Sequence, residues 1–239
     1  MRSTENAHRL AFEVAVQPNG WTCGPTCLHA LYRYYEDAVE LDDVIREVEP
    51  LPGGGTLAVW LACHALRRGY AATIYTYNLQ LFDPTWFAEA GVDLVAKLEA
   101  QQAVKADPRL DLATRAYVEF FGLGGRLTFE ELTPDLLRRW LRRKVPILTG
   151  LSSTYLYGCA REHGDVSDDV RGEPTGHFVV LSGYDPATRE VMVADPLHDN
   201  PRFGTRYYRV GVPRLIASIL LGIVTYEANL LLITPTSPS

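Results

Sequence analysis

Residues 17–27 read QPNGWTCGPTC, and this stretch marks the point where an irregular turn passes into a helix. Its first half contains the turn formers Pro18, Asn19 and Gly20. A helix is expected to begin near Gly24, because Pro25 then occupies the first turn, where a missing N–H is no loss. The stretch LHALYRYYE (28–36) continues this helix. The sequence therefore predicts that Cys23 stands at a helix start.

A cysteine at a helix start is suited to nucleophilic chemistry. The partial positive charge and the free N–H groups of a helix N-terminus favour the thiolate and lower the pKa of the thiol. Gly24 lets a substrate approach the backbone, and we expect Gly24 and Trp21 to contact it. The alternative is a small buried cysteine of the core, the usual fate of a lone Cys. A core cysteine has no need of the Gly-Pro pair that follows Cys23.

Gln17 lies six residues before Cys23, across the turn. Acyl transfer through a thiolate creates an oxyanion, and that charge needs hydrogen-bond donors already aimed at it. The backbone N–H of Cys23 and the side-chain amide of Gln17 are candidates for that pair of donors. Without the spacing to Cys23, Gln17 would be read as a surface residue.

His177 and Asp195 are the candidates for the base and its orienting group. His177 opens the stretch HFVVLSGY (177–184), directly after Gly176, and Asp195 follows VMVA (191–194). If the two stretches form an antiparallel pair through the turn DPATRE (185–190), both residues lie at the same end of the hairpin. Asp195 can then accept a hydrogen bond from one ring nitrogen of His177, while the other nitrogen faces Cys23.

The order of the remaining patterns indicates an α+β fold, in which a helix carrying the nucleophile packs against an antiparallel sheet. Helices are predicted at 41–48 and 56–69, and a strand at 71–77. Short β-rich runs follow near the C-terminus at 145–152, 177–185, 190–196, 206–212 and 229–235. The apolar stretch 215–233 is broken by Gly222, Tyr226-Glu227 and Asn229, so we interpret it as a buried helix and a buried strand and not as a membrane span.

A mainly helical insertion is predicted at about 78–140, within a single domain that covers residues 1–239. Helical spacing is present at 92–106, 112–124 and 132–144, the last with Thr133 as N-cap and Pro134 just inside. The basic run at 138–144 is interpreted as a solvated face near a helix C-terminus.

The motifs taken together resemble the C39-like cysteine peptidases of the papain superfamily. They are Gln17-x5-Cys23-Gly24-Pro25-x-Cys27, then GHFVVxxGYD (176–185), then ADP (194–196), and the similarity covers mainly residues 12–67 and 145–235. The resemblance implies a papain-like fold in which Gln17 serves the oxyanion hole, Cys23 is the nucleophile, His177 the base and Asp195 its partner. Well-known members cut leader peptides after a Gly-Gly pair in export transporters. The chain has no G-x-x-x-x-G-K-[ST] motif and no membrane domain, so we expect a stand-alone enzyme.

The long segment 152–176, which leads directly into His177, is expected to help choose the substrate. It contains Tyr155 and Gly176, and we expect both to contact substrate. Together with the helical insertion, it is hypothesised to cover the Cys–His site.

The remaining cysteines give no sign of a metal or cofactor. Cys27 lies one turn after Cys23 and is interpreted as core; the spacing CGPTC has one residue too many for a C-x-x-C redox pair. Cys63 and His64 have no second pair at metal spacing. We expect no cofactor and no metal.

Charge and composition limit the partners. The 239 residues carry a net charge of -6, which does not favour nucleic acid as a partner. Four cysteines are too few for a disulfide scaffold, and residues 1–17 lack the apolar core of a signal peptide, so a cytoplasmic location is expected. The oligomeric state is left open.

The sequence thus predicts a cysteine-dependent hydrolase that cleaves a peptide or amide bond through a thioester acyl-enzyme. Two alternatives remain: an acyltransferase or transpeptidase that uses the same residues with an amine acceptor, and a catalytically silent peptide-binding module. A further interpretation, a thiol redox protein using Cys23 and Cys27, fails on the spacing of the two cysteines. It also gives no role to His177 or Asp195.

Overall fold

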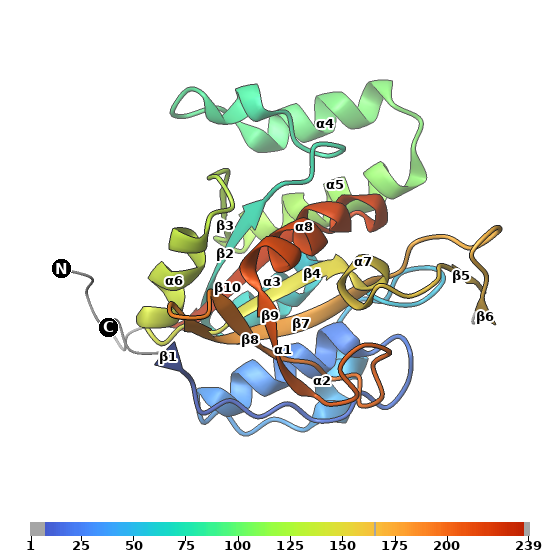
Figure 1. Ribbon diagram of the computed structural model, residues 1–239. Coiled ribbons are helices and arrows are strands. Elements are labelled where there is room, and N and C mark those ends of the chain that lie inside the picture. Colours follow the sequence, from blue (N-terminus) through green and yellow to red (C-terminus); the bar gives the residue numbers. More distant parts are fainter. Residues whose placement is uncertain (1–7, 165, 237–239) are drawn as a thin grey trace.

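The helix predicted after the 17–22 turn is present and begins at Cys23. The computed structural model describes residues 8–164 and 166–236, and helix α1 spans Cys23–Tyr34 (Figure 1). Every residue from Cys23 to Tyr32 is buried, so α1 is a central helix. It packs against strand β7 (Gly176–Asp185), the strand that carries His177. The two ends of the predicted 1–239 domain lie outside the described residues. So does the first part of the 1–17 segment, which we interpret as lacking a signal peptide.

Two further helices complete the N-terminal part, as predicted. Helix α2 (Leu41–Glu47) contacts α1, and α3 (Ala58–Arg67) contacts α1 and strand β2 (Tyr70–Thr76). The glycine-rich turn between α2 and α3 uses positive φ angles at Gly53, Gly54 and Gly55. These angles are ones that residues with a side chain rarely adopt.

The sheet is mostly antiparallel, which confirms the α+β class. Its strand order is β3-β2-β10-β4-β7-β8-β9, with β1 paired to β7. The bounds not yet given are β1 (His8–Arg9), β3 (Arg126–Thr128), β4 (Ile147–Ser152), β8 (Glu190–Ala194), β9 (Tyr207–Gly211) and β10 (Asn229–Pro235). Strands β7, β8 and β9 form the expected meander. One departure is β3, which pairs with β2 in parallel; the long connection between them, which includes helices, permits this direction.

The apolar stretch near the C-terminus forms a helix and a central strand. Helix α8 (Val212–Leu221) packs on β4, and the short 3-10 helix η2 (Gly222–Thr225) leads to β10, which lies between β2 and β4. Figure 1 shows α8 above the sheet and α1 and α2 below it. None of the helices formed by the described residues has the length and apolar character that a bilayer crossing requires.

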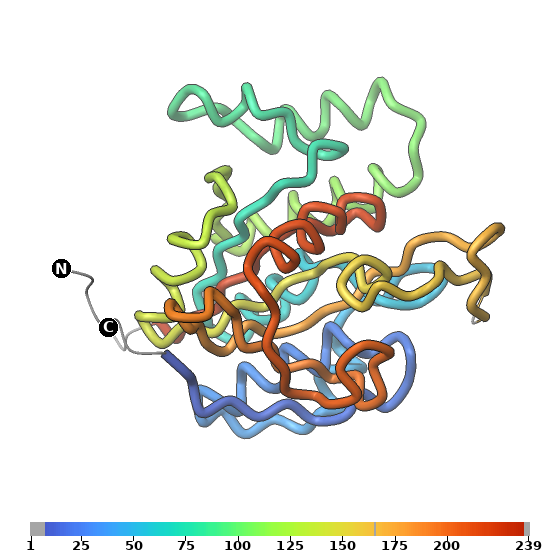
Figure 2. Tube along the Cα trace, viewed as in Figure 1, coloured from blue at the N-terminus to red at the C-terminus, as the bar shows by residue number. Residues whose placement is uncertain are grey.

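The middle of the chain is mainly helical, as predicted, and Figure 2 shows α4 at the top of the view, with α5 below it and partly behind α8. It contains the 3-10 helix η1 (Pro84–Phe87) and the helices α4 (Leu94–Val104), α5 (Pro108–Gly122) and α6 (Pro134–Arg142). Thr133 caps α6 through its side chain, which accepts a hydrogen bond from the backbone N–H of Leu136. The single-domain assignment stays a prediction.

The segment predicted as a long loop contains short elements that the sequence did not reveal. Helix α7 (Ser153–Tyr157) ends at Gly158, and β5 (Glu162–His163) pairs with β6 (Val166–Ser167) in a separate hairpin. Two-residue strands are too short to leave a periodic pattern. The hairpin projects from the molecule at the right of Figure 1.

Strand β10 allows a test of where the fold's stability lies. Leu231 is fully buried between Ile74 and Leu148, its partners on β2 and β4. We expect Leu231→Ala to lower the free energy of unfolding by about 3 kcal/mol, because it leaves a cavity in the core. The matched change Leu79→Ala, at a side chain 58% exposed, should cost less than about 0.5 kcal/mol. Urea denaturation measures both; equal losses would contradict this assignment of the core.

Candidate active site

His177 and Asp195 meet at one end of the β7–β8 hairpin. The two strands pair antiparallel, with Val180 opposite Ala194, and Asp195 directly follows β8. The backbone N–H of Asp195 donates to the carbonyl of Arg206, which holds the end of the hairpin against the next strand. His177 Nε2 lies 2.8 Å from Asp195 Oδ1, and both side chains are buried. The placement expected from the sequence is thus the one found.

Asp195 accepts hydrogen bonds from two tyrosine hydroxyls that no sequence pattern singled out. Tyr157 of α7 and Tyr208 of β9 donate to Asp195 Oδ2 at 2.7 and 2.6 Å, and the backbone N–H of Leu197 donates to Oδ1 at 2.9 Å. Burial alone would raise the pKa of Asp195, but His177 and the two hydroxyls hold it below its usual value. The carboxylate therefore stays charged and has its oxygens fixed in place.

The Cys23 thiol faces His177 at the first residue of α1. No side chain caps this helix, so its first backbone N–H groups are left to the thiol and to whatever binds there. Burial acts to raise the pKa of Cys23. The charge of His177, a hydrogen bond to its ring and backbone hydrogen bonds at Phe178 and Gly24 outweigh burial, and the pKa of Cys23 is lowered.

The ring of His177 is oriented by Asp195. Because Nε2 is engaged with Asp195, Nδ1 is the nitrogen left for Cys23. Burial disfavours a charged imidazole, but the negative charges of Asp195 and Cys23 prevail and raise the pKa of His177. A lowered thiol pKa beside a raised imidazole pKa favours a thiolate–imidazolium pair.

Gln17 lines the same cleft as Cys23 and His177. Its backbone N–H donates to the carbonyl of Pro196 at 3.0 Å, which ties the 17–22 turn to the segment after Asp195. Its side-chain Nε2 donates to the carbonyl of Asn19 at 2.8 Å. One N–H of this amide group therefore remains for a ligand in the cleft.

A cleft of about 410 Å³ opens over Cys23 and His177. Trp21 forms part of one wall, where its ring covers Gly54; any Cβ at Gly54 would lie 2.1 Å from a ring carbon. Of the four residues predicted to contact substrate, Trp21 and Gly176 line this cleft, and Gly24 and Tyr155 do not.

Gly24 and Tyr155 have other surroundings. A Cβ at Gly24 would lie 2.7 Å from the methyl group of Thr56, so this glycine allows α1 to pack closely against the residues before α3. The ring of Tyr155 is 42% exposed and is covered by the guanidinium of Arg214. Their roles as substrate contacts stay predictions.

Cys27 is part of the core, as expected. It is fully buried, and its thiol donates to the carbonyl of Phe178 at 3.3 Å. Burial, with the nearby charges of Cys23 and Asp195, raises the pKa of Cys27 well above its usual value. The pKa of Cys23 is therefore lowered, whereas the pKa of Cys27, one turn later on the same helix, is raised.

Glu227 is a buried acid on the wall of the cleft that the sequence did not single out as functional. Its Oε1 accepts a hydrogen bond from the backbone N–H of Ala58 at 3.1 Å, and its Oε2 accepts one from Asn229 at 3.2 Å. Burial raises the pKa of Glu227 to about 8. Within the part of the chain that the structure describes, no group of three or more His, Cys, Asp or Glu is placed to hold a metal ion.

Comparison with known proteins gives a family match and several similar structures. A family model described as Peptidase_C39 like family matches residues 9–210. No curated protein matches the chain significantly. The family match ends before Thr225 and Glu227, so these two cleft residues lie beyond it.

Three solved structures illustrate the similarity. A protein described as a C39-like peptidase from Bacillus anthracis has 13% identity and a TM-score of 0.49, covering 98% of this chain and 100% of that one. Xylellain, a cysteine protease from Xylella fastidiosa, has 12% identity and a TM-score of 0.44, with 98% and 87% covered. A double glycine motif protease from an AMS/PCAT transporter, in complex with the leader peptide, has 14% identity and a TM-score of 0.46, with 98% and 96% covered.

Replacement of Asp195 tests the electrostatics of the site. Asp195→Asn removes the charge that favours imidazolium at His177, so the pKa of Cys23 should rise. We expect the rate of Cys23 alkylation by iodoacetamide at pH 6 to fall about tenfold or more, since one pKa unit changes the thiolate population tenfold. Asp199→Asn makes the same change beside the exposed His198 and should leave the rate unaltered. Equal rates in all three proteins would contradict the assignment.

Replacement of Glu227 tests its buried, protonated state. Between its usual pKa near 4.5 and the folded value of about 8, the folded protein keeps a proton that the unfolded chain has lost. The free energy of unfolding therefore falls as pH rises through this window, by up to about 1.4 kcal/mol per pH unit. The Glu227→Gln protein has no carboxyl to titrate at this position. The free energy of unfolding of the variant minus that of wild type should therefore increase from pH 5 to pH 8.

Urea denaturation at several pH values measures this difference. Glu99→Gln, at an exposed position on α4, should follow wild type throughout. A stability difference between wild type and Glu227→Gln that stays constant with pH would show that Glu227 titrates normally.

Proposed function

Because this chain belongs to the C39-like peptidase family, we propose that it is a cysteine-dependent hydrolase that cleaves a peptide or amide bond through a thioester acyl-enzyme. Family membership suggests cysteine-dependent peptidase activity. The observation that carries the mechanism is the placement of His177 between Asp195 and Cys23, in the cleft at the N-terminus of α1.

In the first step, the Cys23 thiolate attacks the carbonyl carbon of the substrate. The C–S bond forms, and the carbonyl oxygen takes the negative charge. His177, which holds the proton of the thiol, transfers it to the leaving nitrogen, and the C–N bond breaks. Asp195 keeps the His177 ring oriented for this proton transfer and for the later one from water. Its oxygens are themselves held by Tyr157, Tyr208 and Leu197.

The oxyanion requires donors placed before the reaction begins. The backbone N–H of Cys23 and the remaining N–H of the Gln17 amide are the donors we assign. The uncapped N-terminus of α1 adds favourable partial charge at the same place.

In the second step, water hydrolyses the thioester. His177 takes a proton from water, the hydroxide attacks the acyl carbon, and the tetrahedral intermediate expels the Cys23 thiolate. The product acid leaves, and the thiolate–imidazolium pair is restored.

The proposal is tested by comparing two cysteines on the same helix. Cys23→Ala should abolish cleavage of a mixed peptide library, followed by mass spectrometry, with a loss of at least about a thousandfold. Cys27→Ala removes a thiol of equal size from the core, and its cleavage should stay within a few-fold of wild type once folding is verified by circular dichroism. Cleavage that survives in Cys23→Ala would contradict the proposed nucleophile.

A further inference from the structure

Glu227 is held in the cleft at a conformational cost. It lies between two residues with left-handed backbones, Tyr226 at φ 66° and Ala228 at φ 80°. Residues with a side chain seldom adopt such angles, and each costs on the order of 1 kcal/mol or more. Tyr226 is tied down by its hydroxyl, which donates to Asp107 at 3.0 Å. The backbone on both sides of Glu227 is therefore held in a conformation that residues with a side chain seldom adopt.

Two glycines make room for this segment. A Cβ at Gly150 would lie 2.9 Å from Glu227 Oε2, and a Cβ at Gly176 would lie 2.7 Å from the hydroxyl oxygen of Thr225. Gly176 directly precedes His177, and Gly150 pairs with Phe178 across the sheet. Glu227 is therefore brought beside the strand that carries His177, and it lines the same cleft as Cys23.

The carboxyl of Glu227 has no cationic partner in the described part of the chain. The groups that hydrogen-bond it are the neutral Ala58 N–H and Asn229 amide, and its pKa is raised because no positive charge offsets burial. Asn229 Oδ1, next to it, is buried without a partner. A carboxyl buried without a cationic partner stays protonated, because burial disfavours its charge. A positively charged group brought beside it favours the ionised form, so Glu227 is placed to pair with a cation from outside.

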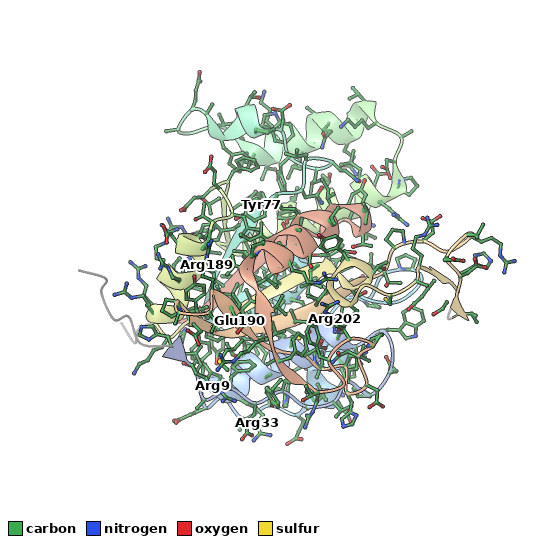
Figure 3. The ribbon with its side chains drawn as sticks, viewed as in Figure 1. Arg9, Arg33, Tyr77, Arg189, Glu190 and Arg202 are labelled. Atoms are coloured by element: carbon green, nitrogen blue, oxygen red, sulfur yellow. The ribbon has the colours of Figure 1, made fainter. Side chains whose placement is uncertain are left out.

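Among the described residues, the side chains that line the cleft include acids but no lysine or arginine. The ionisable residues that line the cleft are Cys23, His177, Tyr157, Cys159 and two acids, Glu162 and Glu227. Arg214 lies near Gly158, outside the cleft, where the carbonyls of Tyr155 and Leu156 bind it. Arg202, labelled in Figure 3, directly follows Pro201 of the cleft wall. Its guanidinium lies near Gly158 and over the ring of Phe203, and it is not among the residues that line the cleft.

We propose that Glu227 is a specificity-determining residue that pairs with an ammonium or guanidinium group of the substrate beside the scissile bond. This inference rests on the proposed function, because it takes the Cys23 cleft as the substrate site. Glu162, partly buried on the β5–β6 hairpin, adds negative charge to the same cleft. The substrate class is then a peptide or amide with a lysine, arginine or free amine near the bond that is cut.

The cation preference is measured without turnover, by the reaction of Cys23 with two methanethiosulfonate reagents. One carries a permanent trimethylammonium group and the other a sulfonate, and the ratio of their rates reports the charge that Cys23 experiences. The Cys159→Ser background leaves Cys23 as the one thiol among the described residues that line the cleft. At pH 9, where Glu227 is ionised, Glu227→Gln should lower the cation-to-anion ratio about tenfold. Glu99→Gln, with the same change in net charge, should not alter it.

Glutamine can still accept the hydrogen bond from Ala58, so Glu227→Gln separates the charge from the contact with the start of α3. An unchanged ratio in a folded Glu227→Gln protein would overturn the inference. An equal drop in Glu99→Gln would also overturn it, since the effect would then come from net charge alone.

Peptide substrates give the second measurement. N-acetylated peptides that carry either lysine or norleucine near the bond are compared. The same peptides with a free N-terminus show whether a terminal amine can replace the lysine side chain. Wild type should cleave the lysine series at least about tenfold faster in kcat/KM, and Glu227→Gln should lose this preference. Equal cleavage of both series by wild type would contradict the inference. If no peptide is cleaved at all, the proposed function fails, and the reagent ratio still decides whether the cleft selects cations.

Discussion

The packing of helix α1 on strand β7 is the interaction on which the site depends. Gly24 has no side chain on this face of the helix, and a Cβ there would lie 3.2 Å from the ring of Phe178 on β7. This contact sets the start of α1, with Cys23, against the start of β7, with His177. The Cys23 thiol is stabilised as a thiolate by both elements: the uncapped N–H groups of the helix and the His177 ring on the sheet. A shift of either element would separate thiol and imidazole.

Much of this arrangement could be predicted because it is local in the sequence. Turn formers followed by Pro25 fix the start of α1, and the turn at 185–190 fixes the β7–β8 hairpin and so the meeting of His177 with Asp195. The helices of the middle segment follow the predicted apolar spacing, and Thr133 caps α6 as predicted. In each case a few neighbouring residues determine the result.

The rest depends on contacts between distant segments. Tyr157 and Tyr208 reach Asp195 from α7 and β9, and no spacing along the chain announces that two hydroxyls will share one carboxylate. Glu227 was visible in the sequence only as an interruption of an apolar stretch. Its position in the cleft follows from β10 lying between β2 and β4, which no local pattern specifies. The parallel pairing of β3 with β2 is of the same kind.

In the proposed mechanism, Cys23 forms a covalent bond with the acyl part of the substrate. Acid quenching within milliseconds of mixing enzyme with a cleavable peptide, followed by intact-mass measurement and peptide mapping, tests it directly. We predict one added acyl group, located on the peptide that contains Cys23, which disappears as the product acid forms. Turnover without any adduct, or with an adduct on Cys159 and none on Cys23, would contradict it.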